Sequence, residues 1–193
     1  EGHLNVNGMS NSNRGSRWAN SALVVTLEPE DFYWKRPGDL DAFGSLAGLE
    51  LQGRLERETY ALGGGGYVAP AQRLTDFVEG RVSELSGDTS YRPGLCASDL
   101  HELLPLRITD PLCRAIHRFE QRLRGFFTGE AVLIATETTT SSPVRILRDP
   151  RTLQAPDFPG LYPCGEGAGY SGGIVSSALE GIRVAEATLR ETT

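Results

Sequence analysis

The stretch GLYPCGEGAGYSGGIVSSALEGIRVAEA, residues 160–187, is the part of the chain that decides the fold. Its pattern predicts a short strand over 160–164, a glycine-rich turn, and a helix from about Ser171 to Arg190. Glycine leaves no side chain between the backbone and a group that approaches it closely. Five glycines occupy the turn and the start of the helix: Gly165, Gly167, Gly169, Gly172 and Gly173.

The chemistry of this turn suits a ligand that carries phosphates or hydroxyl groups. A helix N-terminus presents free backbone N–H groups and the positive end of the helix dipole, which favour an anion or a polarised carbonyl. Glu166 adds an acceptor for hydroxyl groups. The stretch therefore predicts a site for a phosphorylated or polyol cofactor. A plain tight connection between strand and helix explains the same glycines equally well.

Three helices are predicted from apolar residues at helical spacing. The first covers 41–62, and Gly63 is expected to end it with a left-handed cap. The second begins with Asp110 as N-cap and Pro111 at its first position. Its apolar stripe is Leu112, Ile116, Phe119, Leu123 and Phe126. The last helix is expected to bury Val175, Ala178, Ile182, Ala185 and Leu189.

The strands predicted between these helices complete a mixed α+β fold. The apolar segment Ser21–Leu27 reads as a strand, as do Ala131–Thr138 and Pro143–Leu147. Residues 71–83 fit a strand and a helix equally well, and 87–106 are expected to be mostly irregular.

Composition excludes several classes of partner and site. The chain has 193 residues and a net charge of -6, which argues against nucleic acid. No apolar run approaches the roughly 18 residues of a membrane span. Three scattered histidines and three cysteines without C-x-x-C spacing predict neither a metal site nor a disulfide framework. We therefore expect a cytoplasmic protein without a nucleic-acid or membrane partner.

Four stretches, in the same order and near the same spacing, resemble one family. It is the uncharacterised bacterial FAD-dependent dehydrogenases, also called NAD(FAD)-utilising dehydrogenases, which are flavoproteins with two dinucleotide-binding domains. The stretches are NGMSNSNRGSRWANSALVV (7–25), GGGGYVAPAQRLTDFV (63–78), SYRPGLCASDLHELLP (90–105), and ETTTSSPVRILRD (137–149) followed by GLYPCGEGAGYSGGI (160–174).

The resemblance implies the C-terminal portion of an FAD/NAD(P)-binding, Rossmann-like flavoprotein with an inserted substrate or cap domain. The family's G-x-G-x-x-G motif lies upstream of its N-G-M-S segment, and no such turn is present here. The run Gly63–Gly66 follows a predicted helix rather than a strand. We therefore expect the missing N-terminal part of the same protein as a partner. The implied parts are 1–26 and 131–193 in the FAD-binding domain and 27–130 as the insert.

The resemblance also implies FAD as cofactor, a small-molecule substrate, and NAD(P)H as a candidate electron donor. Glu166 would face the ribityl or diphosphate hydroxyls, and the amides near Gly173 and Ile174 would face the pyrimidine edge of the ring. Two departures from the family are Thr139, often arginine there, and Gly15, often aspartate. No catalytic residue is assigned. The implied cofactor-binding residues are Gly165, Glu166, Gly167, Ala168, Gly169, Tyr170, Gly172, Gly173, Ile174, Ser142 and Arg145.

Other candidate side chains have an ordinary structural interpretation beside the functional one. Arg145 is as suited to a surface ion pair as to a ligand oxygen. His101 is a candidate acid or base, although a loop or capping role is favoured. Cys164 is expected to be a small buried residue in a strand. A planar-ligand platform and simple core packing are both open for Trp18, Phe32, Tyr33 and Trp34.

Three functions from different classes follow. The first is part of an FAD-dependent oxidoreductase. The second is a non-catalytic ligand- or partner-binding module with an incomplete flavin site. The third uses FAD structurally, in RNA modification or sensing, and a basic cleft on the surface would favour it.

Overall fold

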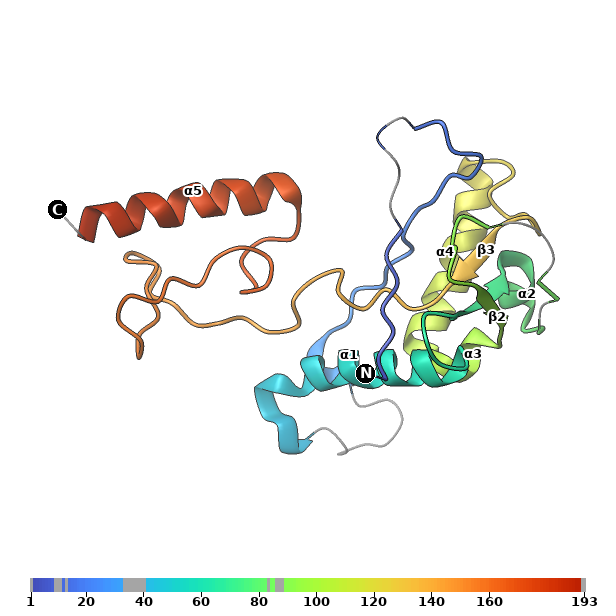
Figure 1. The fold of residues 1–193 in the computed structure, drawn as a ribbon, viewed down its shortest axis with the longest axis horizontal. Coiled ribbons are helices and arrows are strands. Elements are labelled where there is room, and N and C mark those ends of the chain that lie inside the picture. The colour runs from blue at the N-terminus through green and yellow to red at the C-terminus, as the bar shows by residue number, and fades with distance from the viewer. Residues whose placement is uncertain are drawn as a thin grey trace.

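The computed structural model describes residues 2–8, 12, 14–32, 41–82, 84–85 and 89–191. Four helices and a small sheet gather in one part of the molecule, and α5 (Ile174–Glu191) lies apart from them (Figure 1). Long irregular segments join α5 to the sheet (Figure 1). The other helices are α1 (Ala47–Leu62), α2 (Leu74–Glu79), α3 (Leu100–Leu103) and α4 (Leu106–Arg122), with 3-10 turns η1 (Pro29–Phe32) and η2 (Asp41–Leu46).

The sheet has three short strands in the order β2-β1-β3. The central strand β1 (Ala69–Arg73) runs parallel to β2 (Leu95–Ala97) and antiparallel to β3 (Val132–Ile134). Ala71 pairs with Ala97 on one side and with Ile134 on the other. The mixed α+β class is confirmed by this arrangement. The segment 71–83, for which a strand and a helix were equally open, contains both. Strand β1 ends at Arg73 and helix α2 begins at Leu74.

The main core lies between the sheet, α2, α3 and α4. Phe77, Leu100 and Ile116 are fully or almost fully buried at its centre. Burying one such side chain stabilises the fold by roughly 1.5–3 kcal/mol. Leu112, Phe126 and other partly buried side chains pack around them, so part of the predicted apolar stripe of α4 does face the core. Leu123, at the end of that stripe, is exposed instead.

One buried polar side chain, Gln72, connects the sheet to two helices. Its Oε1 accepts a hydrogen bond from the backbone N–H of Leu100 at 3.0 Å. Its Nε2 donates to the carbonyl of Arg81 at 2.7 Å. Both halves of the amide are therefore paired, as a buried amide requires. Gln72 fixes the start of α3 and the segment after α2 on the sheet.

Helix α4 begins earlier than the sequence predicts. Its N-cap is Pro105 rather than Asp110, and Pro111 lies inside the helix. A proline inside a helix removes one backbone hydrogen bond and disfavours the preceding turn. The packing of Thr109 and Ile116, both fully buried on either side of Pro111, retains the helix across it.

The helix predicted over 41–62 is present as η2 followed by α1, but its end differs from the prediction. Gly63 is the C-cap, with a right-handed φ of −70°. A Cβ at Gly63 would lie 2.1 Å from the carbonyl oxygen of Val68, so glycine is required there for close backbone approach. Gly64, Gly65 and Gly66 take the left-handed conformations that follow.

The predicted strands over 21–27, 143–147 and 160–164 are wrong, and β3 is shorter than the predicted 131–138. Isolated strands need neighbours to pair with, and each of these segments makes other contacts. Residues 22–24 line a groove with α4, for example. The predicted buried face of α5 is also wrong, because Val175, Ile182 and Leu189 are exposed while Val184 is buried.

Residues near the N-terminus lie beside the segment that follows β3. The N–H of Val6 donates to the carbonyl of Thr136 at 2.9 Å. The amide of Asn5 accepts from the N–H of Thr138 at 3.0 Å and donates to Thr139 Oγ1 at 2.7 Å. These bonds join two segments that are far apart in the sequence.

Of the helices that the structure describes, none combines the length and the hydrophobicity needed to cross a bilayer.

Candidate functional site

The structure brings the predicted residues Ser142 and Arg145 onto the predicted glycine turn. The hydroxyl of Ser142 donates to the carbonyl of Gly167 at 3.2 Å. Arg145 Nε donates to the carbonyl of Gly169 at 2.9 Å. The N–H of Ile146 donates to the carbonyl of Ala168 at 3.2 Å, and Ala168 is buried. Residues 142–146 therefore hold the turn from one side.

Gly169 meets this supporting segment most closely. It has a φ of 80°, and a Cβ there would lie 2.4 Å from the carbonyl oxygen of Val144. Glycine is required at 169 because the chain's own backbone approaches, and because a side chain at this φ is strained. At Gly169 the close approach therefore comes from the chain's own backbone, which is the tight-connection interpretation of this glycine.

The opposite side of the turn is open. A Cβ at Gly165, Gly167 or Gly172 would meet nothing within 4 Å. Within the part of the chain that the structure describes, the Glu166 carboxylate makes neither a hydrogen bond nor an ion pair, although its residue is half-buried. A carboxylate in this state is ready to accept hydrogen bonds from hydroxyl groups. The open face and Glu166 fit a ligand such as FAD, which carries both hydroxyls and phosphates.

Helix α5 begins directly beside this open face. The carbonyl of Gly173 accepts from the N–H of Ser177 at 2.9 Å and from the hydroxyl of Ser176 at 3.0 Å. Ile174 is the first helical residue, and 92% of it is exposed. The first N–H groups of a helix have no partner within the helix. The start of α5 thus adds donors to the acceptor that Glu166 provides.

Tyr170 contacts the chain's own residues. Its hydroxyl donates to the carbonyl of Ile146 at 2.8 Å. The guanidinium carbon of Arg148 lies 3.6 Å from the centroid of its ring, and that of Arg145 lies 5.2 Å away. Arg148 therefore occupies one face of the ring in a cation–π contact.

Two residues of this site, Arg148 and Glu180, were not predicted from the sequence. Their side chains form an ion pair and are only 5% and 12% exposed. Arg148 Nη1 also donates to the carbonyl of Pro163 at 2.7 Å. Arg148 therefore connects three parts of the chain. It lies in the segment before the turn, contacts the ring of Tyr170 in the turn, and pairs with Glu180 of α5. A signal was present in the second arginine three residues after Arg145, but its partner 32 positions away is visible only in the fold.

The structure also places two other candidate residues, His101 and Cys164. His101 Nε2 donates to the carbonyl of Phe77 at 2.8 Å, and its ring stacks on that of Phe77. His101 lies within α3 rather than in a loop, and the cap of this helix is Asp99, which accepts from the His101 N–H. Cys164 is exposed and lies outside any strand, which corrects the expectation of a buried strand residue.

Of the aromatic residues proposed as a planar-ligand platform, only two can be placed. Phe32 packs against the core of α1, and Trp18 is partly exposed with the guanidinium of Arg17 over its ring. Tyr33 and Trp34 lie outside the described residues. Of the two family departures, Thr139 is hydrogen-bonded to Asn5 and Gly15 is exposed. Among the described residues, no cluster of His, Cys, Asp or Glu is arranged to hold a metal ion.

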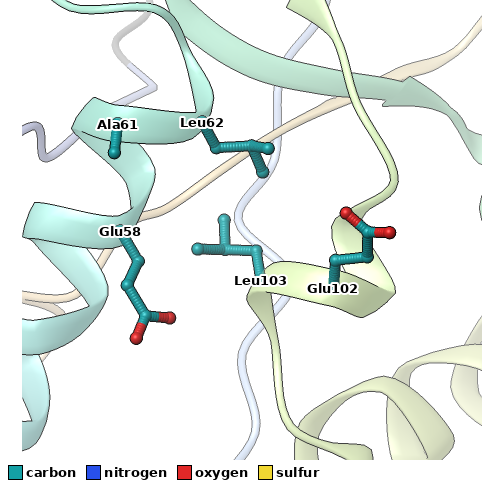
Figure 2. A pocket seen from close by; sticks show the side chains of 5 residues that line it. All are labelled: Glu58, Ala61, Leu62, Glu102 and Leu103. Atoms are coloured by element: carbon teal, nitrogen blue, oxygen red, sulfur yellow. The ribbon is translucent and has the colours of Figure 1, made fainter.

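A separate hollow of about 270 Å³ lies between the end of α1 and α3 (Figure 2). Leu62 and Leu103 point toward one another across it, while the carboxylates of Glu58 and Glu102 lie on either side. None of the predicted cofactor-binding residues lines this hollow.

The chain belongs to a family of FAD-dependent proteins. The family described as FAD-dependent protein, C-terminal domain-like, matches residues 1–140, which include the sheet and helices α1 to α4. The chain is also 43% identical over 188 residues to an uncharacterized protein of Clostridium beijerinckii (strain ATCC 51743 / NCIMB 8052). That similarity covers 96% of this chain and 34% of the relative, so the chain spans about a third of the relative's length. The resemblance drawn from the four stretches is confirmed.

Proposed function

We propose that the chain is part of an FAD-dependent oxidoreductase, in which hydride passes between the flavin and a small-molecule substrate or NAD(P)H. The observation that carries this proposal is the open face over Gly165, Gly167 and Gly172, beside a Glu166 carboxylate that makes no hydrogen bond or ion pair with the described residues. The membership of the chain in an FAD-dependent family supports it. FAD, when bound, supplies a redox chemistry that amino-acid side chains do not provide.

The residues of the turn divide into two groups in this proposal. Glu166 accepts hydrogen bonds from hydroxyl groups of the cofactor, and Gly165, Gly167 and Gly172 allow close approach to the backbone. The amides at Gly173 and Ile174 would donate to the pyrimidine edge of the ring and stabilise the negative charge of the reduced cofactor. Ser142, Ala168, Gly169, Tyr170 and Arg145 keep the turn in shape through their hydrogen bonds and packing.

The proposal divides the chain into 1–26 and 131–193 in a flavin-binding domain and 27–130 in an inserted substrate or cap domain. Hydrogen bonds between residues 4–7 and 136–139 support the association of the first and last parts. We further propose that the exposed apolar face of α5 packs on a part of the same protein outside these 193 residues. The greater length of the Clostridium beijerinckii relative supports this. We propose a cytoplasmic location, in keeping with three unpaired cysteines.

The test is an absorbance spectrum with and without added FAD. It is recorded for the chain and for a version extended upstream, each as wild type and as the Gly167→Ala and Gly167→Leu variants. A side chain at 167 meets open space, so both variants should fold normally. Gly129→Ala is the matched control, because its Cβ would make only an ordinary contact, 3.6 Å from Thr75 Oγ1.

We expect the extended protein to retain flavin, Gly129→Ala to retain it equally, and Gly167→Leu to lose it with an unchanged circular-dichroism spectrum. If Gly167→Leu retains flavin at the wild-type level, the assignment of the turn is wrong. If neither wild-type version retains flavin, the chain is instead a ligand- or partner-binding module.

A further inference from the structure

Helix α4 carries a row of exposed arginines. Arg114, Arg118 and Arg122 are spaced four residues apart and so lie on one side of the helix, along about 12 Å. Arg124 follows them just beyond the helix, and all four are exposed. No ion pair joins these four to a carboxylate of the described residues. Arg107, at the start of the same helix, is by contrast paired with Asp31.

The carboxylate closest in sequence to this row, Glu120, interacts electrostatically with Arg124 but makes its hydrogen bonds elsewhere. Glu120 Oε2 accepts hydrogen bonds from the N–H groups of Gly125 at 3.0 Å and Phe127 at 2.8 Å. Its charge is therefore directed at the turn that follows α4. The second half of α4 is a positive surface on a chain whose net charge is -6.

An apolar groove of about 160 Å³ borders the arginine row. On α4, Arg118 and Arg122 lie three positions after Ala115 and Phe119, a spacing that makes them neighbours on the helix surface. The other wall is the irregular segment 22–24, in which Val24 is largely exposed. The groove is lined by Ala22, Leu23, Val24, Leu112, Ala115 and Phe119.

We infer that this surface docks an acidic amphipathic segment of a partner protein. An aliphatic side chain of the partner enters the groove, and neighbouring carboxylates pair with Arg118 and Arg122. A guanidinium group binds a carboxylate through two parallel hydrogen bonds, which gives both attraction and orientation. An apolar anchor beside complementary charges is the usual composition of a specific interface.

Two observations favour a protein segment over a nucleic acid. The groove has no polar side chain among its lining residues that would recognise a base edge, and the Phe119 ring packs edge-on against Phe126 at 5.3 Å. A long polyanion would also extend over the rest of the chain, which is acidic and would repel it. A short acidic segment contacts only the arginine row.

The test measures fluorescence anisotropy of labelled synthetic peptides with the full chain. The probe is a helical Glu/Leu peptide of about 14 residues, or four turns. A Glu/Ser peptide of equal charge lacks the apolar anchor. We expect the Glu/Leu peptide to bind, with an affinity that falls as the salt rises from about 50 mM to about 200 mM. The Glu/Ser peptide should bind at least tenfold more weakly.

Variants separate the charges from the groove. The exposed pair Arg118→Glu/Arg122→Glu should reduce affinity for the Glu/Leu peptide at least tenfold, with unchanged circular dichroism. Arg151→Glu/Arg190→Glu makes the same charge change at exposed positions elsewhere and should leave affinity unchanged. Ala115→Trp fills the groove and should weaken binding of the Glu/Leu peptide.

Three results would overturn the inference. The first is equal affinity of the Glu/Leu and Glu/Ser peptides. The second is wild-type affinity in the Arg118→Glu/Arg122→Glu variant. The third is tighter binding of a uridine oligonucleotide of matched length, which would make the surface a nucleic-acid site. None of these measurements depends on flavin, so the outcome is independent of the proposed function.

Discussion

Arg148 is a single buried cation that holds three segments of the C-terminal region together. Its guanidinium contacts the Glu180 carboxylate, the Pro163 carbonyl and the face of the Tyr170 ring. Removing one partner of a buried ion pair leaves the other charge without compensation in a poorly solvated place. The shape of the glycine turn therefore depends on a residue that does not belong to the turn.

We expect Arg148→Met to destabilise the packing of the turn on α5 by about 3–5 kcal/mol. Hydrogen exchange of the amides over 165–180 measures this as faster exchange. Arg145→Met is the matched control, because Arg145 is exposed and makes one hydrogen bond to the turn. The control should cost about 1 kcal/mol. Equal protection in the two variants would contradict the role given to Arg148.

Glu120 makes stability depend on pH at the end of α4. Hydrogen bonds from the N–H groups of Phe127 and Gly125 hold the pKa of Glu120 below its ordinary value. A carboxyl whose pKa is lower in the folded state stabilises the fold above its unfolded pKa, which is about 4.3. That contribution is lost as the pH falls through the folded pKa.

We therefore expect Glu120→Gln to be less stable than the wild type near neutral pH, and the difference to shrink below about pH 4. Urea unfolding at several pH values measures the difference. Glu130→Gln, at an exposed position, is the control and should show little change at either pH. A difference that stays constant across the acidic range would show that hydrogen bonding to the charged form is not the cause.

At the scale of elements, Gln72 couples β1 to the segments around it. Gln72→Met keeps the length of the side chain but leaves the Leu100 N–H and the Arg81 carbonyl without their partner. We expect a loss of about 1–3 kcal/mol in the free energy of unfolding, measured with urea. Gln121→Met, on the exposed side of α4, should change it by less than about 0.5 kcal/mol. If the two variants are equally stable, the Gln72 amide does not join these elements.

Helices α1, α4 and α5 could be predicted from the sequence because their apolar residues repeat at helical spacing. Strand β2 and helix α3 could not, and they lie in the segment 87–106 that was expected to be mostly irregular. The boundaries of α4 could not, because the packing of Thr109 and Ile116 outweighs the helix-start signal at Asp110 and Pro111. Strand β1 has the sequence APAQR, which contains no β-branched or aromatic residue. Its place in the sheet depends on partners about 25 and 60 positions away.

In the candidate site, too, features set by neighbouring residues were predicted, and contacts between distant residues were not. The open glycines and the start of α5 are local features, so the sequence predicted them. The Arg148–Glu180 pair joins residues that only the fold brings together. Ile182 and Leu189 were expected to be buried but are exposed, because helical periodicity identifies an apolar face and does not say what covers it. Periodicity thus predicted the helix correctly and its burial within this chain incorrectly.

At the scale of the whole molecule, α5 stands apart from the sheet and exposes apolar side chains (Figure 1). Leu179→Asp/Ile182→Asp should leave the thermal stability of this chain nearly unchanged, because both side chains are exposed in it. In the version extended upstream, where we propose that this face is covered, it should lower the melting temperature by several degrees.

Arg190→Asp is the control, since it introduces the same charged side chain at an exposed position of α5. Arg190→Asp should have the melting temperature of the wild type in both versions. An equal fall in melting temperature for the double variant and Arg190→Asp in the extended version would contradict the proposed cover of α5.

The hydrogen bonds between residues 4–7 and 136–139 also have an evolutionary consequence. Everything from residue 8 to residue 135 leaves and rejoins the remaining chain at neighbouring points, since Asn7 Nδ2 lies 3.3 Å from Glu137 Oε1. Elements with adjacent ends tolerate insertion and permutation well. The proposed insert over 27–130 lies between these two points, so we expect it to be exchangeable between related genes while the glycine turn and α5 stay in place.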